Sequence, residues 1–203
     1  MFTTIVTTHK TKTVIQKTIL LITAFLLFSC TKPIPKPEEV ISSKSQNWKT
    51  EVESTVKLFG HRNWIVVADG AYPKQSNPAI KTITVDANQL EVVQFVNEAI
   101  KKSSHVQANI FLDKEMAFVT EKDAKGIEKY RLELNNTLEA KKIQTMLHED
   151  IIKELDNSAK VFDVLIIKTK LTIPYTSVFF QLDCGYWNTE AEKNLRTNLN
   201  SKQ

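Results

Sequence analysis

The sequence is poor in the residues that mark several common kinds of site. Its 203 residues include only 4 glycines and 2 cysteines. It has no glycine-rich phosphate loop, no His-Glu-x-x-His helix, no closely spaced cysteine pair and no Gly-x-Ser-x-Gly turn. These absences remove support for a nucleotide-binding protein, a zinc protein and a serine hydrolase. With only 6 prolines and 42% hydrophobic residues, a collagen-like or wholly disordered chain is also excluded.

A strong excess of positive charge is also missing. The full chain has 27 Lys and Arg against 23 Asp and Glu, a formal net charge of +4. Lys10, Lys12 and Lys17 lie in the first 29 residues, and removing these three leaves 24 basic against 23 acidic residues, or +1. Because binding to nucleic acid depends on a large positive charge, we expect no nucleic-acid partner.

Residues 1–29 have the order of parts of an export signal. A basic stretch ends at Lys17, an apolar stretch runs from Ile19 to Phe28, and Ser29 precedes Cys30. The apolar stretch is about half of the roughly 20 residues that a transmembrane helix needs. A removable signal is therefore favoured over a permanent membrane span.

The residues around Cys30 predict a lipid anchor. Leu27-Phe28-Ser29-Cys30 resembles the lipobox of bacterial lipoproteins, in which the signal is cut before a cysteine that is then lipid-modified. We expect Cys30 to hold the protein to a membrane of the bacterial cell envelope, facing the periplasm or the exterior; an ordinary signal peptide is the alternative.

The chain after Cys30 predicts a tether, one domain and a tail. Prolines at positions 33, 35 and 37 favour an extended tether over residues 30–47. The expected domain covers residues 48–187, and residues 188–203 form a polar tail.

Short apolar runs alternate with helical patterns through the domain. Strands are predicted by β-branched, alternating or apolar runs over residues 64–68, 80–85, 108–112, 142–147 and 175–182. Helices are predicted by apolar spacing of three and four over residues 49–59, 89–101, 126–134 and 148–161, with Asn88 as a cap. Residues 164–167 fit either an extension of the last helix or a strand. The alternation predicts an α/β protein with a layered sheet.

Polar residues at strand ends are the candidates for a site, because α/β proteins bind ligands there. His61 and Asp69 flank the first strand, His148 follows a later one, and Tyr175 opens the last. The residues alone leave a structural alternative for each. In that alternative, His61 interacts with the exposed carbonyls at the end of a helix, and Asp69 forms a turn. Tyr175 is then a core aromatic residue, and His148 begins a helix.

Two segments near the ends of the expected domain carry a recognisable pattern. The first is Phe59-Gly-His-Arg-Asn-Trp-Ile-Val-Val-Ala-Asp-Gly-Ala-Tyr-Pro73, and the second is Pro174-Tyr175-Thr-Ser-Val-Phe-Phe180. Together with Ile127-Glu-Lys-Tyr-Arg131 between them, they resemble the ribose pyranase and fucose mutarotase family, over roughly Val52 to Leu182.

The resemblance implies a three-layer α/β/α sandwich with a mixed sheet. It further implies an isomerase that interconverts ring forms or anomers of a free monosaccharide such as ribose or fucose, without a cofactor or a metal. Members of the family are homo-oligomers with sugar pockets between subunits. Opening a hemiacetal needs one group to take the anomeric hydroxyl proton and another to protonate the ring oxygen, and a histidine serves either role near neutral pH.

Carried over by position, the resemblance assigns roles to five residues. His61 is the acid/base, Asp69 orients His61 or binds a sugar hydroxyl, and Tyr175 donates to the sugar. His148 and Ser177 are sugar contacts, although Ser177 stands where the family has Asn, with one hydroxyl in place of an amide. A non-catalytic carbohydrate-binding lipoprotein of the same fold is therefore the alternative function, and a scaffold without a ligand is a third.

Overall fold

The computed structural model describes residues 37–139 and 143–201. The leader (residues 1–29), Cys30 and the tether as far as Lys36 lie outside the described residues. The chain divides into two compact units at Val40, and the second unit, Ile41–Gln203, carries the fold. No helix among the described residues combines the length and the apolar character that crossing a membrane requires.

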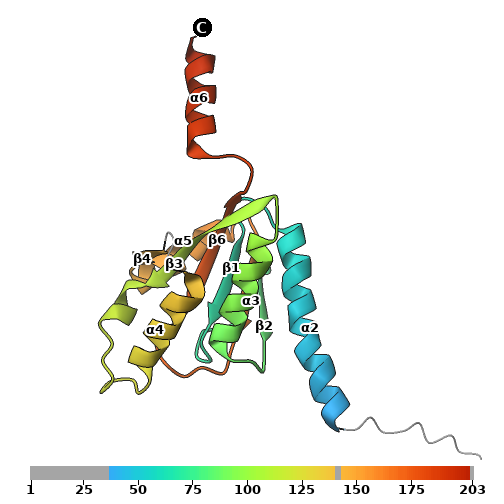
Figure 1. Cartoon of the computed structure of the whole chain (residues 1–203), viewed down its shortest axis with the longest axis vertical. Helices are drawn as coiled ribbons and strands as arrows, with labels where there is room; N and C mark the ends of the chain where they lie inside the picture. Colours follow the sequence, from blue (N-terminus) through green and yellow to red (C-terminus); the bar gives the residue numbers. More distant parts are fainter. Residues whose placement is uncertain (1–36, 140–142, 202–203) are drawn as a thin grey trace, which may run out of the picture. The chain divides into compact units, whose positions relative to one another are not determined.

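The described residues form six strands interspersed with helices (Figure 1). In chain order these are α2 (Pro37–Leu58), β1 (Trp64–Ala68), β2 (Ile80–Thr84), α3 (Gln89–Lys101), β3 (Val106–Asp113), the short 3-10 helix η1 (Lys114–Ala117), α4 (Ile127–Leu138), β4 (Ile143–Met146), α5 (His148–Ser158), β5 (Val164–Lys168), β6 (Val178–Cys184) and α6 (Thr189–Asn200). Each predicted element is present, and residues 164–167 belong to a strand. Asn88 caps α3 as predicted, since its side chain accepts a hydrogen bond from the Leu90 amide.

The extended conformation predicted for the tether is wrong over residues 37–47. Helix α2 begins at Pro37, so residues 37–47 are helical where an extended tether was expected. Proline suits the first position of a helix, because its missing N–H needs no partner there. Residues 189–200 of the predicted polar tail form the helix α6. The Asn188 side chain accepts from the Ala191 amide, and no residue of α6 is buried.

The sheet is mixed, with strand order β2-β5-β1-β6-β3-β4. β6 is antiparallel to both of its neighbours, and every other pair is parallel. Five strands therefore end at one edge of the sheet, and β6 begins at that same edge.

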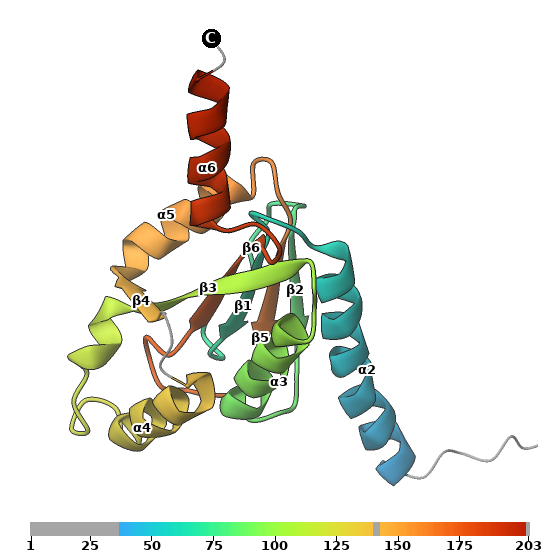
Figure 2. The same ribbon diagram turned by 45° about the horizontal axis from the view of Figure 1, so that its top comes forward.

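Alternate residues of β1 pack against helices on opposite faces of the sheet. Ile65 and Val67 lie in a core with residues of α2, α3 and α4, while Trp64, Val66 and Ala68 lie in a second core with α5. Figures 1 and 2 both show α3 and α4 side by side on one face. The predicted three-layer α/β/α sandwich is confirmed, and burial on both faces explains the continuous apolar run of β1.

The last strand begins later than predicted, at Val178 instead of Tyr175. Tyr175 has φ of 57°, a left-handed conformation that a strand does not contain. Residues 175–177 therefore form the approach to β6.

Candidate functional site

The strand directions gather polar side chains at two opposite edges of the sheet. We call the first the carboxyl edge. Asp69, His148 and Thr169 follow β1, β4 and β5, respectively; Asp113 ends β3, and Tyr175 precedes β6. The second is the amino edge, formed by His61 before β1 and Asp183 near the end of β6. Because β6 is antiparallel to both β1 and β3, these two strands run in the same direction and end at the carboxyl edge, whereas β6 ends at the amino edge.

Asp69 occupies a turn at the carboxyl edge. Its Oδ1 accepts a hydrogen bond of 2.8 Å from the Ala71 amide. The next amide, that of Gly70, donates to the Leu171 carbonyl at 2.8 Å, and a Cβ at position 70 would lie 3.3 Å from that oxygen. The absence of a side chain at Gly70 thus lets the loop after β1 pack directly on the loop after β5.

A buried polar network holds the loop that carries Tyr175. The Thr176 carbonyl accepts from Gln89 Nε2 at 2.6 Å and from the Tyr130 hydroxyl at 2.9 Å. The Thr176 hydroxyl donates to the Ile173 carbonyl at 2.7 Å. A left-handed non-glycine residue costs on the order of 1–2 kcal/mol, and these contacts offset that cost for Tyr175. Tyr175 itself is 39% exposed, so its ring reaches the surface of the edge.

His148 and Asp113 meet because β3 and β4 are parallel neighbours. Asp113 lies opposite Met146 in the register, two residues before His148. His148 Nδ1 lies 3.1 Å from Asp113 Oδ1, and the His148 ring packs edge-on against Tyr175 with centroids 5.6 Å apart. The carboxyl edge thus brings together two of the predicted residues, His148 and Tyr175.

Asp113 is the most buried ionisable group of this edge, with no exposed side-chain surface. The pKa of its carboxyl is raised to about 6, and burial is the largest cause. The charges of Glu115 and Asp69 also raise this pKa, while the hydrogen bond and charge of His148 lower it. Asp113 Oδ2 has no hydrogen-bond partner among the described residues.

The Tyr72 hydroxyl is a second buried polar atom without a hydrogen bond within the described chain. Burial, followed by the charge of Asp113, raises the pKa of Tyr72 well above its usual range, and the Gln75 side chain acts in the opposite direction. Buried polar atoms without a partner are uncommon, and two of them at one edge indicate a place where a polar ligand or water supplies the missing bonds.

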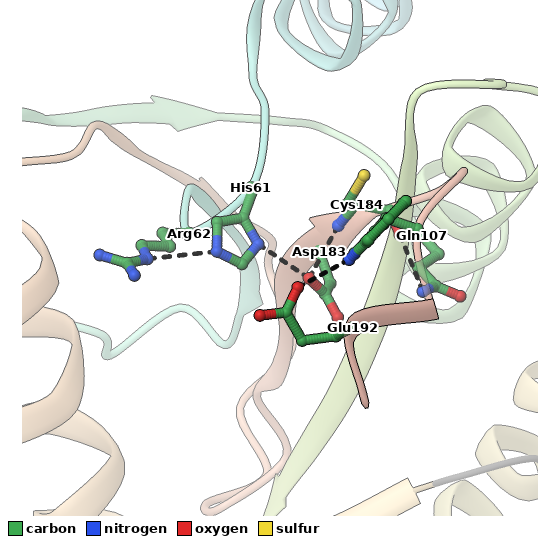
Figure 3. A network of polar contacts seen from close by, with 7 residues as sticks. His61, Arg62, Gln107, Asp183, Cys184 and Glu192 are labelled. Carbon is green, nitrogen blue, oxygen red and sulfur yellow. Dashed lines mark hydrogen bonds and ion pairs between the residues drawn. The ribbon is translucent and has the colours of Figure 1, made fainter. Parts of the chain in front are cut away.

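The amino edge is built around His61 (Figure 3). His61 Nδ1 lies 2.8 Å from Asp183 Oδ1, which also accepts from the Cys184 amide at 2.8 Å. Arg62 Nε donates to His61 Nε2 at 3.2 Å, so both ring nitrogens are engaged and Nδ1 carries the proton. The His61 and Asp183 side chains are 55% and 39% exposed.

The predicted contact between His61 and Asp69 does not exist within one chain. The two residues lie at opposite ends of β1, whose five residues span about 16 Å at ~3.3 Å per residue. Asp183 is the residue that orients His61. Ser177 is 1% exposed, so little of its side chain is available to a ligand.

Three residues of the two edges were missed by the sequence analysis: Asp113, Tyr72 and Asp183. Asp113 directly follows the apolar run of β3, as Asp69 follows β1, so the same strand-end argument applies to it. Tyr72 and Asp183 carry no such signal. The burial of Tyr72 and the contact of Asp183 with His61 both arise from the packing of segments that are distant in the sequence. Within residues 37–139 and 143–201, no three His, Cys, Asp or Glu side chains converge as metal ligands.

The model of the RbsD / FucU transport protein family matches residues 43–184. The chain belongs to this family. The resemblance to ribose pyranases and fucose mutarotases is therefore confirmed at the level of the family.

Among solved structures, the RbsD/FucU member described here is similar to Bacillus subtilis RbsD complexed with D-ribose. The two are 16% identical over 68% of this chain and 94% of the other, with a TM-score of 0.47. It is also similar to the fucose mutarotase from Streptococcus pneumoniae in complex with L-fucose, at 24% identity over the same shares and a TM-score of 0.47. No curated protein matches the chain.

Proposed function

We propose that the protein is a cofactor-free monosaccharide mutarotase or pyranase that binds a free sugar at the carboxyl edge. Family membership supports the reaction class, and the observation that carries the site is the grouping of His148, Tyr175 and Asp69 beside the buried Asp113. His148 Nδ1 is taken by Asp113, whereas Nε2 has no partner in the described part of the chain. A side chain 33% exposed can present that nitrogen to a ligand.

The proposed reaction needs only proton transfer. The anomeric hydroxyl loses its proton to one side chain, the bond between C1 and the ring oxygen breaks, and the ring oxygen receives a proton from a second group. Reclosure on the other face of the carbonyl gives the other anomer, and reclosure through another hydroxyl gives the other ring size. In this proposal Asp69 and Tyr175 bind sugar hydroxyls. The sugar contact assigned to Ser177 rests on the resemblance alone.

His61 enters this site only from a second copy of the chain. It lies at the amino edge, so one copy does not combine His61 with Tyr175. We therefore propose a homo-oligomer with the sugar between subunits, where the amino edge of one copy meets the carboxyl edge of the next. Arg62, which is exposed, must then release His61 Nε2.

The lipid anchor at Cys30 and the location in the bacterial cell envelope are also proposals. Cys30→Ala should abolish lipid attachment and move the protein from the membrane fraction to the soluble fraction. An unchanged mass of the Cys30-containing peptide in the wild type would contradict the anchor.

Exchange NMR on free monosaccharides tests the reaction directly. Ribose and fucose come first, followed by a panel of other free sugars, with the full chain and with His148→Gln. Acceleration of ring-form or anomer exchange by the wild type, lost in the variant, is the expected result. Line broadening without acceleration would instead identify the carbohydrate-binding alternative, and neither effect would leave a scaffold.

Mixing two inactive variants tests the composite site. His61→Ala and His148→Ala change opposite edges, so random mixed oligomers should regain about a quarter of the sites when an edge from each copy forms one pocket. The variants are unfolded and refolded together, and refolding each variant alone provides the control. No recovery in the mixture would place the whole site in one chain.

A further inference from the structure

Two independent contacts hold His148 at the start of α5. Its backbone amide donates to both carboxylate oxygens of Glu115, at 3.0 and 3.1 Å, and its ring contacts Asp113 through Nδ1. Leu147, at the N-cap position, has no side chain that could cap the helix, so Glu115 supplies the cap from η1. Capping by Glu115 alone stabilises the helix start; it does not require the ring to be held as well.

The contact with Asp113 determines which nitrogen of His148 is free. With Asp113 ionised, Nδ1–H donates to Oδ1, and Nε2 keeps a lone pair. The Tyr175 ring stands at 85° to the imidazole, so the histidine is flanked on two sides while 33% of its side chain stays exposed. His61 differs, since Arg62 already donates to its Nε2.

The surroundings of Asp113 are almost entirely acidic or neutral. Glu115 from η1 and Asp69 from the loop after β1 both raise the pKa of Asp113, the Tyr72 hydroxyl lies near it, and the hydrogen bond from His148 lowers the pKa. Because His148 Nδ1 lies within hydrogen-bond distance of Asp113 Oδ1, the His148 ring is the group that this buried carboxylate orients.

We propose that Asp113 is the positioning residue of the sugar site, holding His148 by Nδ1 so that Nε2 accepts the proton of the anomeric hydroxyl. This inference rests on the proposed function. The O–H bond of the anomeric hydroxyl breaks and an Nε2–H bond forms. The electrons of the O–H bond become the second bond of the carbonyl. The pair of the breaking C1–O bond stays on the ring oxygen, which takes its proton from the second acid of the site, His61 of the neighbouring copy in the proposed function.

Asp113→Asn tests the role of the carboxylate, with Asp123→Asn as the matched control. Asp123 is an exposed acid whose carboxylate accepts hydrogen bonds from the Thr120 amide and hydroxyl and contacts no residue of the carboxyl edge. Asp113→Asn should lower the maximum exchange rate about 10- to 100-fold, while the sugar concentration for half-maximal rate changes less than about threefold. The control should leave both quantities unchanged.

Nitrogen-15 spectra of labelled histidine rings report the tautomer of His148, which a purely structural role of Asp113 would leave unchanged. In the wild-type full chain near pH 7.5, His148 should show the tautomer with the proton on Nδ1, and Asp113→Asn should shift the population toward Nε2–H. The wild-type spectrum needs no variant, so it decides the matter even where Asp113→Asn does not fold. A wild-type ring protonated on Nε2 would overturn the proposal.

The outcomes separate the two proposals. A wild type that accelerates exchange, together with a folded Asp113→Asn variant of equal rate at every pH, overturns the role of Asp113 and leaves the proposed function standing. A wild type that accelerates no sugar overturns the proposed function. The nitrogen spectra then decide alone whether Asp113 holds the ring.

Discussion

The two histidine–carboxylate pairs of this protein have the same chemical composition and different surroundings. At the amino edge, His61 and Asp183 are both exposed, and both His61 nitrogens have partners within the chain. At the carboxyl edge, Asp113 is fully buried, and neither its Oδ2 nor His148 Nε2 has a hydrogen-bond partner among the described residues. Bulk water screens the first pair, whereas the carboxylate of the second has no exposed side-chain surface. Within one chain, burial, more than residue type, therefore distinguishes the two pairs.

The largest difference between the two pairs is expected in the rate of sugar exchange. His148→Gln removes the free nitrogen and should reduce the exchange rate by about 10²- to 10⁴-fold, the usual contribution of a general acid or base. His105→Gln is the control, because the His105 side chain hydrogen-bonds to the Ser103 hydroxyl and the Phe59 carbonyl and not to a residue of the carboxyl edge. Exchange NMR measures both variants, and equal rates in the two would remove His148 from the reaction.

The next effect is on the pH dependence of stability. Because the pKa of folded Asp113 is raised to about 6 from 3.8, its carboxyl stays protonated in the folded state while the unfolded chain ionises. The free energy of unfolding therefore falls between these two pH values, by about 3 kcal/mol in total, and the loss is complete above about pH 6.

Asp113→Asn removes this titration. The free energy of unfolding of the variant, relative to wild type, should rise by about 3 kcal/mol from below pH 3.8 to above pH 6, as measured by urea denaturation. Asp123→Asn should change in the opposite direction, because hydrogen bonds from Thr120 lower the pKa of that exposed carboxyl. A variant curve parallel to the wild type would show that Asp113 has an ordinary pKa.

A smaller effect is expected from the network under Tyr175. Tyr130→Phe removes one of the two donors to the Thr176 carbonyl and leaves a Gln89 N–H without its acceptor, which should cost about 1–2 kcal/mol of unfolding free energy. Amide hydrogen exchange at residues 173–177 should become faster. Tyr186→Phe, at a residue 78% exposed, is the control and should change neither measurement.

The smallest effect on stability is expected at the amino edge. His61→Ala removes a hydrogen-bonded pair that is solvent-exposed within one chain and should cost less than about 1 kcal/mol of the unfolding free energy of a single copy. Thermal or urea unfolding measures this cost, with Asp183→Asn as the companion variant. A loss above ~2 kcal/mol in either variant would indicate that the amino edge is buried against another copy of the chain, as the proposed homo-oligomer requires.

Local patterns in the sequence determined most of the fold. The apolar run of residues 64–68 and the cap at Asn88 depend only on neighbouring residues, and both elements appear with their predicted bounds. The start of β6 did not follow its strand propensity, because the network of Gln89, Tyr130 and Thr176 holds Tyr175 in a left-handed conformation. Helix α2 likewise began 12 residues before the expected Lys49, since the helical pattern continues into residues expected to be a tether.

The sequence by itself determined the α/β class, the family and the rule that polar residues at strand ends are candidates. Only the tertiary structure decided which of these residues meet. It separated His61 from Asp69 by the length of β1, paired His148 with Asp113 through parallel neighbours, and paired His61 with Asp183 through the reversed β6. The reason is physical: secondary structure arises from neighbours along the chain, whereas a site depends on strand order, direction and burial, which residues far apart in the sequence set together.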